Sequence, residues 1–554
     1  MQMNGSQIIL EILLEHGVDT VFGYPGGAIL NLYDALYDYK DRIKHILTAH
    51  EQGASHAADG YARASGKTGV VFATSGPGAT NLVTGIATAF MDSVPMVAIT
   101  ANVGSSLIGR DAFQEVCITG ITLPITKHNF FVNRIEDLIP SLRAAFQIAN
   151  SGRKGPVLVD ITKDVTGAMY DYEPAKPAKI KKLPKPKQFV IEELALMIKT
   201  SKRPLIYFGG GVVSGNAENE LRELVEKADI YATHTLMGAG VLGYDHPKNL
   251  GLIGMHGKAA ANSAVAKCDL VIALGTRFSD RVALNPECFA KDAIRVHIDI
   301  DKSEINKNVH VDLGICAEIK DVLKMLNPLV EKVNHTEWDE FIEKQKKRDR
   351  VVKAKPDNLH PSEVITAICD NTDKETIYVT DVGQHQMWAA QYIKHRKTKQ
   401  FLTSGGLGTM GYGYGAAIGA QEAFPKKRVI HITGDGSFHM NMNEASTAVS
   451  KQLPIITVII NNKVLGMVYQ WQGLLYKKRY SETTVTKNSD YVKLAEGFGG
   501  IGYRATTLEE FKTVFKKALK VKDRPVWIEC IIDKEERVLP MIPNGGTIDN
   551  IIED

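Results

Sequence analysis

The chain has 554 residues, of which 44% are hydrophobic and 23% are charged, and its formal net charge is +3. A chain of this length forms about three or four domains, each large enough to bury its own core. Acidic and basic residues are mixed along most of the sequence, so the charge favours neither a nucleic acid nor a membrane surface as a partner. The six cysteines are widely spaced without a CxxC pair, which argues against a disulfide framework or a zinc site and indicates reduced thiols.

The amino-terminal stretch MQMNGSQIILEILLEHGV has the pattern of an amphipathic helix. It lacks the basic segment and the cleavage site of a secretory signal, and it is too acidic for a transit peptide. No apolar run approaches the length that spans a membrane, and LPIITVII at 453–460 has the pattern of a strand. We therefore expect a soluble, cytoplasmic protein.

Two segments have the composition of linkers between domains. Residues 172–188 carry four prolines among lysines, which predicts an extended and exposed chain. Residues 336–360 predict a charged linker helix that ends around Pro356 and Pro361. Elsewhere, short β-branched runs alternate with helical patterns, which is typical of parallel sheets covered by helices. The expected domains are 1–171, 189–335 and 361–535, followed by a tail at 536–554.

The first and third of these domains resemble each other. Residues 69–100 and 428–460 both run as strand, Gly-x-Gly turn, helix, proline and strand. Upstream, the segments that begin at Gly53 and Gly411 each precede their turn by 23 residues. Any two doubly wound sheets share some likeness, but matching offsets over two consecutive units favour an ancient duplication. The copies differ at the middle of the turn, which is proline in the first and aspartate in the second.

That aspartate is the first element of a candidate metal site. Asp435 stands in a Gly-Asp-Gly turn directly after a buried apolar strand, and Asn461 and Asn462 end the next strand. Parallel strands present their carboxyl ends at one edge of the sheet, where ligands bind. A carboxylate and an amide oxygen are therefore expected side by side, and both are hard ligands that suit Mg²⁺ and its bound phosphates. Taken alone, a Gly-Asp-Gly sequence is more often an ordinary turn.

The spacing of this turn and the Asn-Asn pair resembles the cofactor motif of thiamine-diphosphate enzymes. The fold that this resemblance implies is α/β, with three doubly wound parallel-sheet domains: an N-terminal pyrimidine-binding domain, a central domain, and a C-terminal domain that binds diphosphate and Mg²⁺. The metal would take Asp435, Asn462 and the main-chain oxygen of Val464. Met410 would be the apolar wedge that bends the cofactor, and its alternative is an ordinary core methionine. The residues that the resemblance places against thiamine diphosphate are Gln384, His385, Gly408, Met410, Gly436, Ser437 and Met467.

Thiamine chemistry also needs a carboxylic acid that holds the aminopyrimidine ring, so that C2 of the thiazolium can lose its proton. Glu51, in ILTAHEQGASHAADGYA, follows an apolar run and precedes small residues that suit close helix packing. An isolated glutamate in such a place is by default a helix-capping acid. In thiamine enzymes the activating glutamate lies at this position of the first domain, so the resemblance implies a buried, catalytic Glu51 in apolar surroundings.

The middle segment narrows the choice of enzyme. LIYFGGGVVSG (205–215) is a strand and a glycine turn without the GxGxxG spacing of the NAD fingerprint, and ALGTRFSDR (273–281) and VHIDID (296–301) are strands that end in groups able to hold a nucleotide. Together with GRDAFQE, ITKHNF, MHG and MVYQWQ, these strings resemble acetohydroxyacid synthase, and specifically its FAD-containing large catalytic subunits, over nearly the whole chain. The resemblance places FAD, as a structural group, against Arg153, Gly209, Gly210, Gly211, Thr235, Leu236, Met255, His256, Gly275, Arg277 and Asp299.

In this family, pyruvate loses CO₂ on the cofactor and the remaining two-carbon unit adds to a second 2-oxo acid. Pyruvate as acceptor gives 2-acetolactate, and 2-oxobutanoate gives 2-aceto-2-hydroxybutanoate, in the biosynthesis of valine, leucine and isoleucine. Arg281 matches the family's arginine for the acceptor carboxylate, although it could be a surface arginine paired with Asp280. Trp471 would line the pocket for the acceptor's alkyl group; unmatched, it would be a core tryptophan. The resemblance also places Gln114 and Gly26 beside the reacting carbons, and Phe113 and Lys163 at the mouth.

The resemblance has consequences for assembly and inhibition. Because Glu51 and Asp435 belong to different domains, they must face each other around one cofactor, and in the family they come from two chains, which implies a homodimer or a tetramer. No regulatory domain is appended, so any feedback control would come from a separate small subunit. Several relatives carry Pro and Arg before the DAFQE string. This chain instead has Gly104, Ser105 and Ser106 at the mouth where herbicides bind in the family, which leaves its inhibitor sensitivity open.

Other interpretations are weaker. A catabolic acetolactate synthase does without FAD and is not expected to carry both DAFQE and RFSDR, and a flavin-dependent pyruvate oxidase would reduce its flavin with pyruvate. A non-catalytic sensor or scaffold of the same fold would be favoured by the loss of Glu51 or Asp435, and both are present. An NAD dehydrogenase is disfavoured because the dinucleotide fingerprint is missing.

Overall fold

Three six-stranded sheets with helices packed against them make up the protein. The computed structural model describes residues 1–349, 358–485 and 489–553. The sheets have the strand orders β3-β2-β4-β5-β7-β6, β11-β10-β9-β12-β13-β14 and β16-β15-β17-β18-β20-β19, which confirms the expected fold class. By its contacts the chain divides into two compact units: one contains Met1–Lys181, Glu375–Gln386 and Leu402–Lys534, and the other contains Lys182–Lys374, Met387–Phe401 and Glu535–Asp554.

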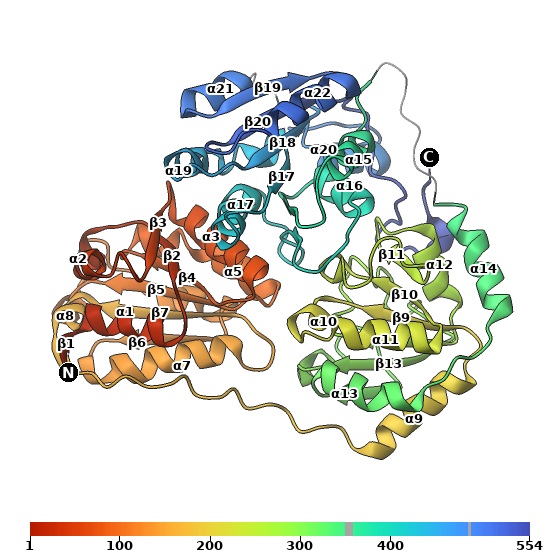
Figure 1. The fold of residues 1–554 in the computed structure, drawn as a ribbon, viewed down its shortest axis with the longest axis horizontal. Coiled ribbons are helices and arrows are strands. Elements are labelled where there is room, and N and C mark those ends of the chain that lie inside the picture. The colour runs from red at the N-terminus through yellow and green to blue at the C-terminus, as the bar shows by residue number, and fades with distance from the viewer. Residues whose placement is uncertain (350–357, 486–488, 554) are drawn as a thin grey trace. The chain divides into compact units, whose positions relative to one another are not determined.

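The first sheet is covered by helices on both faces (Figure 1). Along β4, Val70 and Phe72 pack with α1, α2 and α7, whereas Val71 and Ala73 pack with α3 and α5. Burial of both faces of parallel strands explains their nearly continuous apolar sequences. The bounds are α1 Gly5–Glu15, β2 Thr20–Gly23, α2 Leu30–Asp38, β3 Lys44–Leu47, α3 Glu51–Ser65, β4 Gly69–Ala73, α4 Pro77–Thr80, α5 Val83–Met91, β5 Met96–Asn102, α6 Ile118–Thr122, β6 His128–Val132, α7 Leu138–Asn150, β7 Pro156–Thr162 and α8 Lys163–Gly167.

The amino-terminal helix begins later than its pattern suggests. Residues Gln2–Asn4 form strand β1, which pairs antiparallel with β8 (Met169–Asp171). The side chain of Asn4 accepts a hydrogen bond from the backbone of Gln7, whose own side chain accepts one from the backbone of Asn4. This reciprocal capping starts α1 at Gly5.

The middle sheet belongs to the second unit and is parallel throughout. Its strand order reverses direction between β9 and β12, the place where such sheets bind ligands. Its elements are α9 Gln188–Thr200, β9 Pro204–Phe208, α10 Gly210–Ser214, α11 Glu218–Ala228, β10 Tyr231–His234, β11 Asn249–Leu252, α12 Ala259–Lys267, β12 Leu270–Leu274, β13 Ile294–Asp299, β14 Leu313–Cys316, α13 Ile319–Leu326, α14 Thr336–Lys346 and α15 Pro361–Asp370.

The first expected linker is extended as predicted, whereas the helix of the second is shorter than predicted. Between β8 and α9 the chain has no helix or strand and is mostly exposed, as the prolines and lysines predict. The charged helix is α14, but it ends at Lys346, earlier than expected. Its end is crowded with cations, and the carboxylate of Asp349 accepts a hydrogen bond from the backbone N–H of Ala259, which draws the chain towards the start of α12. The remainder of the expected helix, 350–357, lies outside the described residues.

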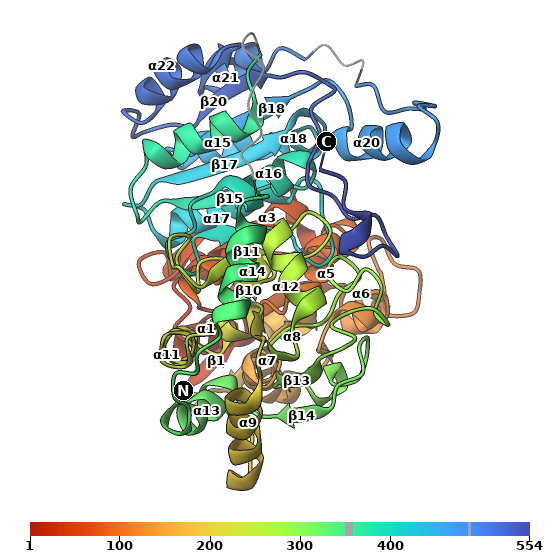
Figure 2. The ribbon, with the colours of Figure 1, turned by 90° about the vertical axis from the view of Figure 1, so that its right-hand side faces the viewer.

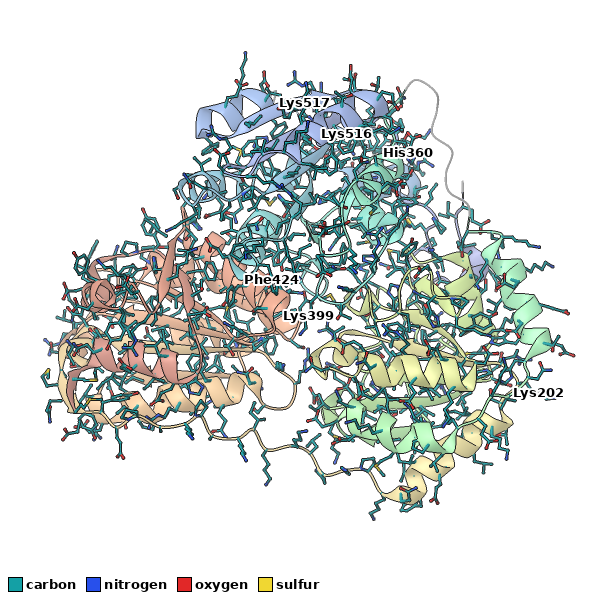
Figure 3. The ribbon with its side chains drawn as sticks, in the orientation of Figure 1. Lys202, His360, Lys399, Phe424, Lys516 and Lys517 are labelled. Atoms are coloured by element: carbon teal, nitrogen blue, oxygen red, sulfur yellow. The ribbon has the colours of Figure 1, made fainter. Side chains whose placement is uncertain are left out.

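The third sheet completes the first unit, apart from the short strand β16 at its edge. The pairs β15–β17, β17–β18, β18–β20 and β19–β20 are parallel. Helix α20 follows β18 (Figure 2), and α22 has acidic residues in its first turn and Lys516 and Lys517 in its last (Figure 3), which suits the helix dipole. The bounds are β15 Ile377–Thr380, α16 Gln384–Tyr392, β16 Phe401–Leu402, α17 Tyr412–Ala423, β17 Val429–Gly434, α18 Asp435–Phe438, α19 Ala445–Ser450, β18 Ile456–Asn461, α20 Gly466–Leu475, α21 Tyr491–Phe498, β19 Ile501–Ala505, α22 Leu508–Ala518 and β20 Val526–Ile531.

Helices α3 and α17 join the first and third sheets into one core. A Cβ atom added to Gly60 would lie 2.2 Å from the carbonyl oxygen of Ala416, and one added to Gly419 would lie 1.9 Å from that of Ala57. The two backbones approach each other so closely that side chains larger than glycine do not fit at these points. These are the helices of the two segments that the internal repeat makes equivalent, so the duplicated halves pack through corresponding elements.

We expect Gly419→Ala to lower the thermal unfolding midpoint, because the added methyl group meets a helix backbone that cannot rotate away. Overpacking of this kind costs about 1–3 kcal/mol. The control is Gly497→Ala in α21, where a Cβ would meet no heavy atom within 4 Å and where alanine favours the helix by up to about 1 kcal/mol. Differential scanning calorimetry of both variants measures the effect, and equal midpoints would contradict the close helix contact.

Candidate active site

Asp435 lies at the carboxyl end of β17, at the start of the short helix α18, and is buried. Burial raises the pKa of its carboxyl group to about 7, although the backbone N–H groups of Asp435, Gly436 and Asn462 act in the opposite direction. None of the described lysines or arginines forms an ion pair with it. A buried carboxylate that lacks a cation of the protein's own fits a metal ligand.

Asn462 follows β18, the neighbour of β17, so the structure brings it to the same edge as Asp435. Its amide nitrogen donates to Oε1 of Gln384 at 3.0 Å, and Gln384 in turn donates to Gln470 at 3.0 Å. The amide oxygen accepts from the backbone of Val464 at 3.2 Å. Because the nitrogen is committed to Gln384, the oxygen of Asn462 is the atom available to a cation.

Glycines line this edge of the sheet. A Cβ atom at Gly434 would lie 2.8 Å from Nδ1 of His385, and one at Gly466 would lie 2.0 Å from Oε1 of Gln384. Burial lowers the pKa of His385 to about 4, and its Nε2 is buried without a hydrogen-bond partner among the described residues. An orphaned buried nitrogen beside a glycine turn fits a polar ligand group such as a phosphate.

The other residues expected at the cofactor come from two segments. The hydroxyl of Ser437 accepts a hydrogen bond from the backbone N–H of Gly411, which joins α18 to the start of α17. Gly408 is exposed and Met410 is partly buried, in the loop between β16 and α17. Met467 and Trp471 are partly buried on α20, the helix that follows β18.

A buried ion-pair network anchors the loop that carries Gly408 and Met410. Arg63 on α3, whose side chain is 9% exposed, pairs with Asp59 and with Asp92, and it also donates to the carbonyl oxygen of Thr403. Asp92 accepts hydrogen bonds from the backbone N–H groups of Gly405 and Gly406. The hydroxyl of Tyr412 donates to Asp59 at 2.7 Å. The network therefore links α3, the turn after α5, and both ends of the loop.

Glu51 is the first residue of α3 and is buried, as expected, but its surroundings are not purely apolar. Its carboxylate accepts a hydrogen bond from Nδ2 of Asn81 at 2.9 Å. Gly78, in the turn that corresponds to the Gly-Asp-Gly turn of the other half, would place a Cβ 3.3 Å from Oε1. Burial, with the nearby Glu51 charge, raises the pKa of Tyr33. The acid is therefore oriented by polar neighbours that the sequence did not reveal.

The expected substrate residues of the first domain cluster near its carboxyl edge. Gly26 follows β2 and packs against Thr74, where a Cβ would lie 2.4 Å from Cγ2. Gln114 has φ of +60° and packs against Gly76. Phe113 is 87% exposed; Lys163 is also exposed, at the start of α8.

The segment expected at the mouth of the site is tied to α8. Ser105 donates its backbone N–H and its hydroxyl to the carboxylate of Asp164, at 2.8 and 2.7 Å. Gly104 and Ser106 flank this contact, and Lys163 is the neighbour of Asp164 in sequence. The Gly-Ser-Ser sequence therefore forms a definite contact with the helix that carries Lys163.

In the second unit, the residues expected at FAD gather at the carboxyl ends of β9, β10, β12 and β13. A Cβ at Gly211 would lie 2.5 Å from the Cα of Gly275, so the turns after β9 and β12 are in backbone contact. Gly209 also packs against Gly275 and Thr235. Leu236 follows Thr235, Gly210 lies between the other two glycines, and Asp299 ends β13.

One of the residues expected at FAD is a buried histidine. Neither ring nitrogen of the buried His256 forms a hydrogen bond with the described residues, and burial lowers its pKa to about 4. The Sδ atom of its neighbour Met255 lies 3.9 Å from Nη1 of Arg281. Arg277 is partly buried. Glycine contacts at a switch point and orphaned polar atoms fit a dinucleotide, so FAD suits this edge.

The last two expected site residues, Arg281 and Arg153, belong to different units. The side chain of Arg281 is 58% exposed and lies 3.8 Å from Asp280, as its alternative interpretation predicts, and it also donates to Asn544 at 3.3 Å. Arg153 belongs to the first unit, where Nε donates to the hydroxyl of Ser93 at 2.8 Å.

Comparison with known proteins identifies the family. Three domain descriptions match: "Thiamine pyrophosphate enzyme, N-terminal TPP binding domain" over residues 3–121, the central domain of the same family over 191–326, and its C-terminal TPP binding domain over 381–530. The chain belongs to the thiamine pyrophosphate enzymes. Within these enzymes it belongs to the family of acetolactate synthase large subunits, because relatives of that name match it along its full length.

Three of these relatives show the extent of the match. The chain is 47% identical to the "Probable acetolactate synthase large subunit" of Methanocaldococcus jannaschii, which covers 100% of this chain and 95% of the relative. It is 45% identical to the "Acetolactate synthase isozyme 2 large subunit" of Escherichia coli, with 100% of both chains covered. It is 44% identical to the "Acetolactate synthase large subunit" of Corynebacterium glutamicum, and the match covers 99% of this chain and 90% of the relative.

The described residues contain no helix that is both long and apolar enough to cross a membrane. They also contain no group of three or more His, Cys, Asp and Glu side chains arranged for a metal ion.

Several residues of this site were missed by sequence reasoning. Asn81, Arg63, Asp92 and Gln470 all contact expected site residues or the loops that carry them. Glu444 lies close to the Gly-Asp-Gly turn in sequence, yet two of its three hydrogen-bond donors are the backbone N–H groups of residues 49 and 50. No spacing rule connects positions so far apart, so only the fold identifies them.

Replacement of Arg63 tests the anchoring network. Arg63→Leu leaves Asp59 and Asp92 buried without their cation, and breaking a buried pair costs about 3–5 kcal/mol. Arg134→Leu is the control, because it removes an exposed pair with Glu136 that is worth about 0–1 kcal/mol. Urea unfolding followed by fluorescence measures both variants. A loss for Arg63→Leu no larger than that of the control would refute a structural role for the network.

Proposed function

We propose that the protein decarboxylates pyruvate and condenses the two-carbon unit with pyruvate or 2-oxobutanoate, giving 2-acetolactate or 2-aceto-2-hydroxybutanoate for branched-chain amino-acid biosynthesis. The observation that carries this proposal is the edge formed by β17 and β18. There a buried carboxylate and an amide oxygen lie beside glycine turns in a chain whose relatives are named acetolactate synthases.

Asp435, Asn462 and the main-chain oxygen of Val464 would hold Mg²⁺, and the metal would share its shell with the cofactor diphosphate. The turn from Gly436 to Ser437 would bind the diphosphate through backbone N–H groups. Gln384, His385, Gly408, Met410 and Met467 would complete the site for thiamine diphosphate. Bound thiamine diphosphate supplies a nucleophilic carbon that adds to a ketone and retains the electron pair when CO₂ leaves.

Glu51 would hold a ring nitrogen of the aminopyrimidine and move a proton to and from it. Asn81 donates to one of the two carboxylate oxygens, which leaves the other for the cofactor. A fixed acid at the first position of a helix keeps one orientation through each turnover. The role therefore combines general acid–base chemistry with positioning.

The acceptor site would contain Arg281 and Trp471. Arg281 would bind the carboxylate that both acceptors share, and Trp471 would face the alkyl group that distinguishes them. One methylene buried against such a wall changes selectivity by about 10- to 200-fold. Gln114 and Gly26 would lie beside the reacting carbons, and Lys163 and Phe113 would line the mouth.

FAD would occupy the edge formed by Gly209 to Gly211, Thr235, Leu236, Met255, His256, Gly275, Arg277 and Asp299, and Arg153 would be a further contact. Its role would be structural, so no electrons need to enter or leave it in the condensation. In this respect the proposed synthase differs from a pyruvate oxidase.

The functional assembly would be a homodimer or a tetramer, with Glu51 of one chain serving the cofactor held by Asp435 of another. All three relatives described above are named large subunits, in organisms that include Methanocaldococcus jannaschii and Escherichia coli. A separate small regulatory subunit is the partner that such a name implies.

We expect the purified protein to bind FAD without a covalent bond, to stay yellow during anaerobic turnover, and to form acetolactate from pyruvate. The absorbance near the flavin maximum and a colorimetric acetolactate assay, run on the same sample, test both points. Stoichiometric bleaching of the flavin by pyruvate would overturn the synthase in favour of an oxidase. If the protein neither forms acetolactate nor bleaches its flavin, the explanation that remains is a non-catalytic relative.

Glu51→Gln is expected to leave thiamine diphosphate and Mg²⁺ bound but to slow proton exchange at C2 of the cofactor. The amide still forms hydrogen bonds but cannot transfer the proton, and acid–base help of this kind is worth on the order of 10²–10⁴-fold. Exchange is followed by NMR after acid quenching in D₂O. Asp435→Ala is the matched variant, because it should abolish metal-dependent cofactor binding instead. Normal exchange in Glu51→Gln would remove Glu51 from this role.

A further inference from the structure

Glu444 is a fully buried carboxylate that reaches from one half of the first unit into the other. It ends a short 3₁₀ helix before α19 and has 0% exposure. Its Oε1 accepts the backbone N–H of His50 at 3.0 Å, and its Oε2 accepts that of Ala49 at 3.2 Å and the hydroxyl of Thr447 at 2.7 Å. Two of its three donors are therefore the amides directly before Glu51.

We propose that Glu444 is a positioning residue for Glu51: it fixes the turn at Ala49 and His50 so that the Glu51 carboxyl group is held in one orientation towards the cofactor. This inference rests on the proposed role of Glu51. Because Glu51 is the first residue of α3, the direction of its side chain is set by the two peptide groups that precede it.

The chemistry of the turn requires a carboxylate. The two N–H groups are adjacent donors at the start of a helix, and they point at separate oxygens of one side chain. A glutamine has one acceptor oxygen, so one amide would face an NH₂ group and lose its partner. The negative charge also lies at the positive end of the α3 dipole. Burial raises the pKa of Glu444, while hydrogen bonds from Thr447 and the two amides lower it.

The packing around Glu444 leaves it no alternative position. A Cβ added to Gly53 would lie 2.0 Å from Oε1 and 2.4 Å from Cδ, so the carboxylate rests directly on the backbone of α3. The side chain thus closes the gap between the start of α3 and the segment after α18. Through this contact, the half that carries Asp435 sets the geometry of the half that carries Glu51.

The competing explanation is that Glu444 only stabilises the contact between the two halves. Glu422 provides the matched control. Its side chain is also buried, it lies at the end of α17, and it pairs with Lys44 of the first half without touching residues 49–51. A residue that only stabilises the contact between the halves can therefore be compared with a positioning residue within the same unit.

The experiment compares Glu444→Gln with Glu422→Gln in the full-length protein. We expect both to lower the unfolding midpoint, but only Glu444→Gln to expose the amides of Ala49 and His50 to hydrogen exchange in the cofactor-free protein. In the loaded enzyme, C2 proton exchange and kcat should fall on the order of 10²-fold, whereas cofactor affinity and KM for pyruvate should stay unchanged. Gly53→Ala, which displaces the carboxylate and leaves it intact, should slow C2 exchange in the same way.

Two outcomes would overturn the inference. The first is that Gly53→Ala and Glu444→Gln exchange the C2 proton at the wild-type rate, although their amides at 49 and 50 are exposed to hydrogen exchange. The second is an equal loss of C2 exchange in Glu422→Gln, which would make the effect one of stability. If wild-type protein itself neither exchanges the C2 proton nor forms acetolactate, the proposed function fails rather than the role of Glu444.

Discussion

The close packing of α3 against α17 is the constraint on which the first unit depends. Glycines at 60, 415 and 419 bring the two helix backbones into direct contact, and a side chain at any of these positions would meet backbone atoms. Glu51 begins α3, and the backbone N–H of Gly411, the residue before α17, donates a hydrogen bond to the hydroxyl of Ser437. The positions of the proposed acid and of the proposed diphosphate site therefore both follow from one helix pair.

Charged groups are buried around this helix pair, which is costly unless each is paired or hydrogen-bonded. Arg63 is matched by Asp59 and Asp92, and Glu444 is matched by three donors. Two helices in a purely apolar contact could shift along each other, whereas these charged groups keep their ion pairs and hydrogen bonds in one arrangement only. We interpret them as elements that specify the relative placement of α3, the loop before α17 and the turn at residue 50.

Sequence reasoning predicted what local patterns encode and missed what distant contacts decide. The strands before Asp435 and Asn462 and their adjacency at one sheet edge follow from apolar runs and turn residues, whereas the burial of Glu51 was expected from the family resemblance. The hydrogen bond from Asn81 to Glu51 could not be predicted, because nothing in the chain between them signals it. The charged helix was expected to continue to the prolines, yet a contact of Asp349 with the start of α12 accompanies its earlier end. These misses share one cause, namely partners that only the folded chain brings together.

We propose that each half of the first unit carries half of a site and that two copies of the chain complete it. Within one chain, Glu51 lies beside Gly78 and Asn81 of its own half, and Asp435 lies beside Asn462 of the other. The most direct test mixes Glu51→Gln and Asp435→Ala proteins, refolded or co-expressed as hybrids, and measures acetolactate formation. If the site is shared, random pairing restores about a quarter of the wild-type sites, because half of the dimers are hybrids with one intact site. Activity no higher than that of the separate variants would contradict the claim.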